Sequence, residues 1–359
     1  MSIKKLIVLT TALSSLSLAA QAEEVTLMSW GGAYATSQIE GYNKPYTAET
    51  GVTVNMVDAD NPATPVKAMV EAKNVTIDIA DVEYADAVRM CDEGLLETID
   101  HSALPAAPDG TPAAEDFLPG ALTDCGVANI VFSTVFAYDT TKFPTAPTGI
   151  ADFFDTEKFP GKRGMRKGAK ANLEMALMAD GVPAAEVYAT LDTPEGVDRA
   201  FAKLDTIKAD TIWWEAGAQP PQLLADGEVA MTTAYNGRIF AAAVNEGKPF
   251  QVIWDGQVYE YDMFVIPKGT PNLEAAKKYL AYATGTKPLA EQAKWISYGP
   301  ARKSSGEFVG LFNDGKTEMA PHMPTAAANL TNALASSYEF WVDHDSELNE
   351  RFNSWLAAN

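Results

Sequence analysis

The sequence predicts an α/β protein of two lobes, each a mostly parallel sheet flanked by helices, with a cleft between the lobes. A chain of 359 residues is long enough for two domains, at about 100 to 200 residues each. Strand and helix patterns alternate over residues 25–82, as in parallel sheets covered on both faces. Two long apolar segments, 128–138 and 259–267, are suited to carry the chain out of one lobe and back.

The first 22 residues have the parts of a secretory signal peptide. Lys4 and Lys5 precede an apolar stretch at 6–20, and Ala-Gln-Ala at 20–22 matches the small-x-small cleavage pattern. The stretch is too short to anchor the chain, and no other run approaches roughly 18 consecutive apolar residues. No lipobox cysteine stands at the cleavage point. We therefore expect a mature chain that begins near Glu23, is free in the periplasm and does not insert into the membrane.

The first lobe begins with a βαβαβ pattern. Residues 25–30 (VTLMSW) alternate and run into Gly31 and Gly32, which suit a tight turn before a helix. Gly51 ends that helix, and the β-branched residues that follow favour a second strand. The predicted elements are a strand at 25–30, a helix at 33–49, a strand at 52–57, a helix at 65–72 and a strand at 77–82.

The same alternation continues after a Pro-rich stretch at 104–119. Residues 128–138 are too apolar for an exposed hairpin and too β-branched for a helix, so they predict a long strand. Further on we expect helices at 170–179, 195–209, 220–226 and 273–285, and strands at 229–233, 250–254 and 259–267. We expect lobe one to comprise residues 23–137 and 263–320, and lobe two residues 138–262 and 321–359.

The chain has two cysteines, Cys91 and Cys125. In an oxidising compartment an even pair favours a disulfide. The alternative is two buried thiols that act as small apolar residues.

The composition argues against several classes of function. Forty-eight acidic against 27 basic residues give a net charge of −21, which would repel a nucleic acid. His101, His322 and His344 are scattered, and no HExxH, GxSxG or Walker motif occurs. We therefore expect no enzyme, no metal and no cofactor. A secreted enzyme that uses the cleft and a secreted adhesion or scaffold protein remain as alternatives.

Aromatic and charged residues follow several predicted strands. In open α/β sheets, ligands lie beyond the carboxyl ends of the strands. The residues at those places include Trp30, Tyr34, Glu83, Tyr84, Tyr235 and Arg238. They suit a pocket for a small solute, although each aromatic side chain could instead pack in the core.

Five segments carry a resemblance to a known family: SWGGAY, IDIADVEYADAVRMCDEGLLETID, AYNGRIF, YEYDMFVIPKGTPN and WISYGPARKS. In this order they resemble the periplasmic solute-binding proteins of ABC importers, in particular the spermidine/putrescine-binding group, which includes γ-aminobutyrate binders. The resemblance implies the two-lobed type II fold and crossing strands between the lobes. It also implies closure on a small solute and delivery to a membrane permease. We expect a monomer.

The resemblance also suggests site residues. Asp262 falls on the acidic position of the late crossing strand, and Tyr235 falls on an aromatic wall where the family usually has Trp. Tyr298 matches another aromatic contact, and Trp30 and Tyr34 lie in the aromatic segment after the first strand.

The chain departs from the polyamine binders at the start of the second lobe. Gly168 and Ala171 stand where those proteins have Asp and Glu, and Arg166, Lys167 and Lys170 lie close by. We expect the two lysines to form a solvated face.

These departures favour a ligand that carries a carboxylate. The guanidinium of Arg238 offers a planar pair of donors to a carboxylate and would repel a polycation. We therefore hypothesise a zwitterion such as γ-aminobutyrate. Its carboxylate would pair with Arg238, its ammonium with Asp262 and Glu260, and its spacer would lie against Tyr235, Trp30 and Tyr298. A polyamine ligand stays open, as does an Arg238–Asp262 ion pair that only shapes the cleft. A ferric-iron binder is disfavoured because Ala234 precedes Tyr235, where such proteins have a second Tyr.

Overall fold

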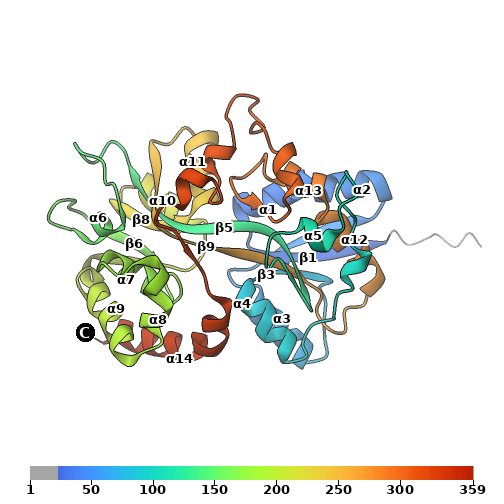
Figure 1. Ribbon diagram of the computed structural model, residues 1–359, viewed down its shortest axis with the longest axis horizontal. Coiled ribbons are helices and arrows are strands. Elements are labelled where there is room, and N and C mark those ends of the chain that lie inside the picture. Colours follow the sequence, from blue (N-terminus) through green and yellow to red (C-terminus); the bar gives the residue numbers. More distant parts are fainter. Residues whose placement is uncertain (1–22, 359) are drawn as a thin grey trace, which may run out of the picture.

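A computed structural model describes residues 23–358 and shows a continuous sheet that runs through both lobes (Figure 1). Over these residues the sheet has 11 strands, with the main order β2-β1-β3-β9-β5-β8-β6-β7. The strands of the first lobe are β1 (Glu24–Ser29), β2 (Thr53–Asp58), β3 (Ile79–Glu83) and the short β4 (Leu122–Thr123). Those of the second are β6 (Arg163–Arg166), β7 (Thr211–Trp214) and β8 (Met231–Tyr235). Pairing is parallel among β1, β2 and β3 and among β6, β7 and β8, so the α/β prediction is confirmed.

Two long antiparallel strands join the lobes. β5 (Gly126–Asp139) and β9 (Phe250–Val265) pair along most of their lengths and cross the middle of the molecule (Figure 1). Two short strands, β10 (Gly299–Pro300) and β11 (Leu334–Ala335), pair with β5 and β9 respectively.

The prediction of separate strands at 250–254 and 259–267 is wrong, because both belong to β9. The chain bends within this strand at Gly256, whose φ is 79°. A Cβ there would lie 2.5 Å from the Cβ of Ile150. Gly256 therefore lets the side chain of Ile150 pack closely against the strand.

Helices cover both faces of the sheet. In the first lobe they are α1 (Gly32–Gln38), α2 (Lys44–Thr50), α3 (Ala63–Glu71), α4 (Tyr84–Asp92), α5 (Ala113–Asp116), α12 (Leu273–Ala283) and α13 (Thr286–Gln292). A π-helical segment, Ile39–Asn43, joins α1 to α2, so the predicted helix at 33–49 is one helical run with a wider turn inside it. In the second lobe they are α6 (Ile150–Phe154), α7 (Asn172–Ala179), α8 (Val187–Leu191), α9 (Pro194–Asp205), α10 (Gln219–Ala225), α11 (Asn236–Asn245) and α14 (Tyr338–Ala357).

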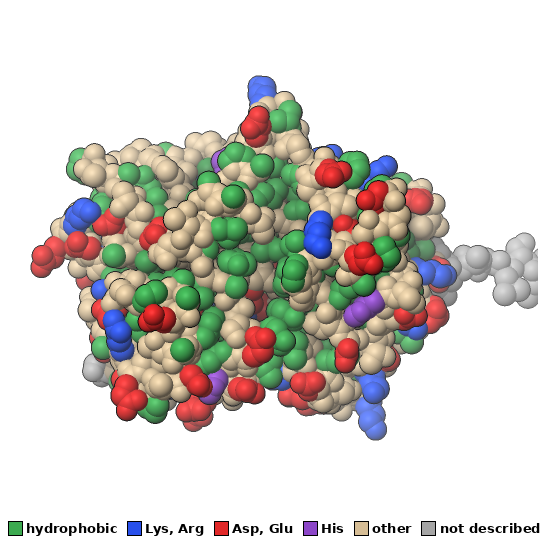
Figure 2. Space-filling view, in the orientation of Figure 1, with side chains coloured by type: hydrophobic (Ala, Val, Ile, Leu, Met, Phe, Trp, Pro, Cys, Tyr) green, Lys and Arg blue, Asp and Glu red, His purple; other side chains and the backbone are tan. Residues whose placement is uncertain are grey.

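Two large apolar clusters form the cores of the lobes. One contains Tyr42, Phe264 and Tyr279 and packs around β1 to β3 and α12. The other contains Trp341 and Phe352 and packs around α7, α9 and α14. Figure 2 shows apolar side chains gathered along the middle of one face and charged ones mostly toward its margins. The lobe boundaries at 137/138, 262/263 and 320/321 remain our proposal.

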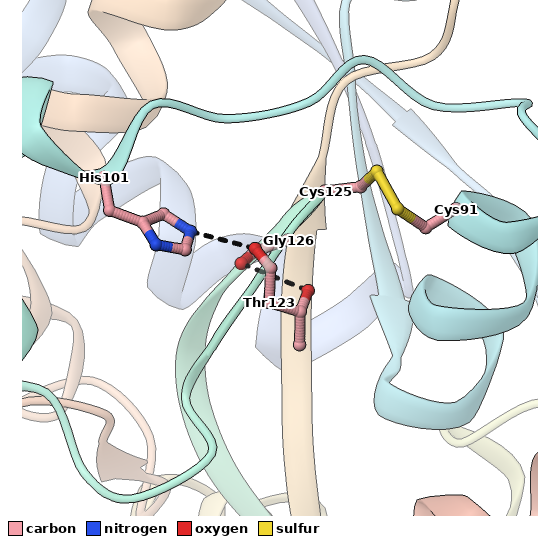
Figure 3. The surroundings of a disulfide bond; sticks show 5 residues. All are labelled: Cys91, His101, Thr123, Cys125 and Gly126. Carbon is pink, nitrogen blue, oxygen red and sulfur yellow. Dashed lines mark hydrogen bonds between the residues drawn. A yellow bond between two sulfur atoms is a disulfide. The ribbon is translucent and has the colours of Figure 1, made fainter.

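Cys91 and Cys125 form a disulfide, as predicted (Figure 3). The bond ties α4 to the residue before β5. Close to it, the ring nitrogen Nε2 of His101 lies 2.9 Å from the carbonyl oxygen of Thr123. The start of the first crossing strand is therefore attached to the first lobe by a covalent bond and a polar contact.

The structure contains no helix in residues 23–358 that is both long and apolar enough to cross a membrane. The predicted signal peptide, residues 1–22, lies outside the described residues.

Candidate ligand-binding site

The turn between β1 and α1 brings the first lobe against α11 of the second. Gly31 and Gly32 have φ values of 65° and 58°, which L-residues with a Cβ rarely adopt. A Cβ on Gly32 would lie 2.7 Å from Nη1 of Arg238. The two glycines therefore let this turn contact the guanidinium closely.

A small, nearly filled cavity of about 20 Å³ lies between the lobes. Six of its eight lining residues are predicted site residues, namely Trp30, Tyr34, Tyr235, Arg238, Asp262 and Tyr298. The other two are Glu83 and Phe132. Glu83 was named above for its position after the third predicted strand, but no contact with ligand was assigned to it. Phe132 lies inside the apolar run of β5, where nothing distinguishes it from a core residue.

Two predicted site residues lie elsewhere. Tyr84 and Glu260 line a neighbouring crevice together with Tyr261 and Ser336. The ring of Tyr84 packs on those of Tyr261 and Tyr338, with centroids 5.8 and 4.4 Å apart. Glu260 accepts a hydrogen bond from Nζ of Lys170 at 2.5 Å.

The aromatic walls are held by edge-to-face contacts. The ring of Tyr34 meets that of Tyr298 at 5.4 Å, and Phe132 meets Tyr235 at the same distance. Trp214 supports Tyr235 from behind, with centroids 5.6 Å apart. These distances are typical of favourable aromatic pairs, so the walls are stiff before any ligand arrives.

Arg238 is buried, with 4% of its surface exposed. Its Nη1 donates to the carbonyl oxygen of Gly31 at 2.7 Å and its Nη2 to that of Trp30 at 3.1 Å. Its Nε has no hydrogen-bond partner. Across residues 23–358, no ion pair joins Arg238 to Asp262. Neutral carbonyl groups hold the guanidinium in place, and no carboxylate within residues 23–358 forms an ion pair with it.

Asp262 is also buried, and its Oδ1 has no hydrogen-bond partner. Burial, together with the nearby carboxylates of Asp81 and Glu83, raises its pKa well above the usual value. Behind it, Oδ2 of Asp81 accepts hydrogen bonds from four side chains, those of Ser29, Tyr34, Gln38 and Asn129. Burial still raises the pKa of Asp81 to about 7. Lys170 favours ionisation of Asp262, but less than burial and the neighbouring carboxylates oppose it.

Two basic residues of the second lobe contact Glu83. Arg166 Nη1 lies 2.7 Å from Glu83 Oε1, and Lys170 Nζ lies 2.9 Å from Oε2. Burial disfavours the charged form of Glu83, but Lys170 and Arg166 outweigh it and lower the pKa to about 2. The predicted solvated face is therefore wrong for Lys170, which is buried. Lys167 is exposed and pairs with Glu215 at 2.8 Å.

Residues 42–325 match the family of bacterial extracellular solute-binding proteins. The chain belongs to this family.

Among its relatives, the binding protein is 46% identical to a γ-aminobutyric acid-binding protein of Pseudomonas aeruginosa, over 94% of this chain and 92% of the relative. It is 25% identical to spermidine/putrescine-binding periplasmic protein 1 of Haemophilus influenzae, over 72% of this chain and 71% of the relative. A solved structure of the Atu4243 GABA receptor shares 33% identity at a TM-score of 0.79, with coverage of 94% of this chain and 98% of that one.

The side chains that line the cavity of this solute-binding protein are suited to a small molecule with opposite charges. They offer a cationic donor at Arg238, an acceptor at Asp262 and apolar rings around them. In the described part of the chain, no group of three or more His, Cys, Asp or Glu side chains is arranged to hold a metal ion.

Proposed function

We propose that this solute-binding protein captures a short ω-amino acid, with γ-aminobutyrate the best candidate, and delivers it to the permease of an ABC importer. One observation carries the proposal. A buried guanidinium and a buried carboxylate, each with an atom that lacks a hydrogen-bond partner, line the same small aromatic cavity. Burial of such groups is unfavourable while they lack a partner, and it becomes favourable once an opposite charge pairs with them.

In this proposal the ligand carboxylate pairs with Arg238 and the ammonium with Asp262. The methylene spacer lies against the rings of Trp30, Tyr235 and Tyr298. The names of the two similar γ-aminobutyrate proteins support this assignment. The protein binds and releases its ligand and catalyses no reaction.

A polyamine is the less favoured ligand. Both ends of putrescine are cations, and one of them would meet the guanidinium of Arg238. The resemblance implies acidic residues in polyamine binders at the positions of Gly168 and Ala171. In this chain the neighbouring residues are instead the cations Arg166 and Lys170, and both pair with Glu83.

The cellular location is the periplasm in this proposal. The family is extracellular, and residues 1–22 have the sequence of a cleaved signal peptide. The mature protein would act as a monomer.

Calorimetric titration of Arg238→Ala against γ-aminobutyrate and putrescine tests the assignment. Removing one member of a buried charge pair costs about 2 to 5 kcal/mol, so affinity for γ-aminobutyrate should fall by at least about 30-fold. Binding of putrescine should stay unchanged or improve. Lys167→Ala, at an exposed residue outside the cavity, is the control and should bind like wild type. Equal losses for both ligands in Arg238→Ala would contradict the proposal.

A further inference from the structure

A larger crevice lies beside the small cavity, and charged side chains separate the two. The crevice has a volume of about 380 Å³, against about 20 Å³ for the cavity. Glu83 lines both spaces, while Arg166 and Lys170 line the crevice. We name these three residues the partition.

Arg166 packs against the cavity wall from the crevice side. Its Nη1 lies 2.7 Å from Glu83 Oε1. Its guanidinium carbon lies 6.0 Å from the ring centroid of Trp30 and 5.8 Å from that of Tyr235, within the range of a cation–π contact. Arg166 therefore contacts three residues that line the cavity.

Lys170 holds Glu83 in place from the other side. Its Nζ lies 2.9 Å from Glu83 Oε2 and 2.5 Å from Glu260 Oε2. Burial lowers the pKa of Lys170, but the two carboxylates outweigh it and raise the pKa well above the usual value. Opening such a buried ionic cluster would leave unpaired charges, so the partition stays closed.

The partition lies beside Asp262. Glu83 is the direct partner of Asp262 in the pairing of β3 with β9, and such cross-strand neighbours have Cβ atoms about 4.5 to 5.5 Å apart. The ammonium end of the ligand, as proposed above, is thus the end that faces the partition.

We infer that Arg166 limits the length of the ligand by filling the space between the cavity and the crevice. This inference rests on the proposed function. In the proposed pose the spacer of a ligand lies between Arg238 and Asp262, which line the same cavity. A longer homologue would press its ammonium against the guanidinium of Arg166. Without that side chain the two spaces would join, and Glu83 Oε1 would be free to accept the ammonium of a longer ligand.

Calorimetric titration with β-alanine, γ-aminobutyrate, 5-aminovalerate and 6-aminohexanoate tests the inference on wild type, Arg166→Ala, Arg166→Met and Lys278→Ala. One methylene is worth about 10- to 200-fold in discrimination, so wild type should prefer γ-aminobutyrate to 6-aminohexanoate by at least about 100-fold. That ratio should fall at least about tenfold in Arg166→Ala. It should be kept in Arg166→Met, whose side chain still fills the space, and in Lys278→Ala, a control at an exposed residue that lines neither space.

An unchanged ratio in Arg166→Ala, or equal relaxation in Arg166→Ala and Arg166→Met, would overturn the inference while leaving the proposed function intact. If wild type binds none of the four compounds, the proposed function fails, and the inference fails with it. Should Arg166→Ala prove unstable, Arg166→Ser replaces it, because the short hydroxyl side chain opens the same space and keeps a hydrogen-bond donor beside Glu83. The same relaxation is then expected.

Discussion

At the residue scale, the surroundings of Asp262 favour a protonated carboxyl group until a cation binds beside it. The acidic neighbours Asp81, Glu83 and Glu260 raise the pKa of Asp262, and the ammonium of Lys170 lowers it. Burial first, and then Asp81, raises its pKa, so the empty cavity favours the protonated carboxyl. An ammonium pairs only with the carboxylate. Binding of the proposed ligand should therefore displace a proton.

We predict that affinity for γ-aminobutyrate rises with pH as Asp262 ionises in the empty protein. The sign follows from the raised pKa: at low pH the ligand must first remove the proton, and at high pH it does not. Titrations in two buffers of different ionisation enthalpy should show the release of about one proton per ligand. Asp262→Asn should bind more weakly and release no proton from this site. Proton release of the same size in Asp262→Asn would assign the effect to another group, with Asp81 the first candidate.

At the element scale, a buried carboxylate on α7 is one of the contacts that join α14 to the rest of the second lobe. Oε1 of Glu174, on α7, accepts hydrogen bonds from the indole Nε1 of Trp341 at 2.7 Å and from the hydroxyl of Tyr188 at 3.1 Å. Its Oε2 has no partner. Burial raises the pKa of Glu174 from 4.5 to about 7, because the ionised form is poorly solvated there. The helix pair is therefore most stable when Glu174 carries a proton.

The free energy of unfolding should consequently include a contribution from Glu174 that depends on pH. The contribution is fully present below pH 4.5 and is lost as pH rises to about 7. Its size is on the order of 3 kcal/mol. Glu174→Gln, which cannot ionise, should flatten the pH dependence of stability by that amount in denaturant titrations.

Glu186→Gln is a control for this prediction, because Glu186 is exposed in a segment close to the same helices. It should leave the pH dependence unchanged. Parallel curves for wild type and Glu174→Gln would show that Glu174 has no such role.

At the scale of the whole molecule, the binding cavity and the disulfide are separate features. Trp30, Tyr34 and Glu83 reach the cavity from the first lobe, and Tyr235 and Arg238 from the second. A ligand that contacts both sets favours the closed arrangement by its differential binding energy. The disulfide joins two segments of the first lobe, and neither cysteine lines the cavity.

Cys91→Ala/Cys125→Ala should therefore lose stability and keep its affinity for ligand. The bond closes a loop with a sequence separation of 34, which corresponds to about 3 to 4 kcal/mol in the chain-entropy model. Denaturant titration measures the loss, and calorimetry with γ-aminobutyrate measures the affinity. A large loss of affinity in the folded variant would show that the disulfide also shapes the cavity.

Local patterns in the sequence determined much of this protein. Alternation and glycines predicted β1 to β3 and the turn that presents Trp30 and Tyr34. The apolar, β-branched run at 128–138 predicted a crossing strand, and the even number of cysteines predicted the disulfide. A position at a strand end, together with the family resemblance, brought Arg238 and Asp262 into consideration. These features depend on residues that are near one another in the chain, where the pattern itself carries the information.

Contacts between distant residues were decided only by the tertiary structure. The burial of Lys170 depends on Glu83 and Glu260, 87 and 90 positions away in the chain, and no local pattern distinguishes it from the exposed Lys167. Phe132 faces the cavity because β8 and the segment of Tyr298 lie against β5. Tyr84 and Glu260 face a different crevice because other remote segments pack around them. Charge and apolarity are properties of single residues, but the surroundings that decide their effect form only when remote segments pack together.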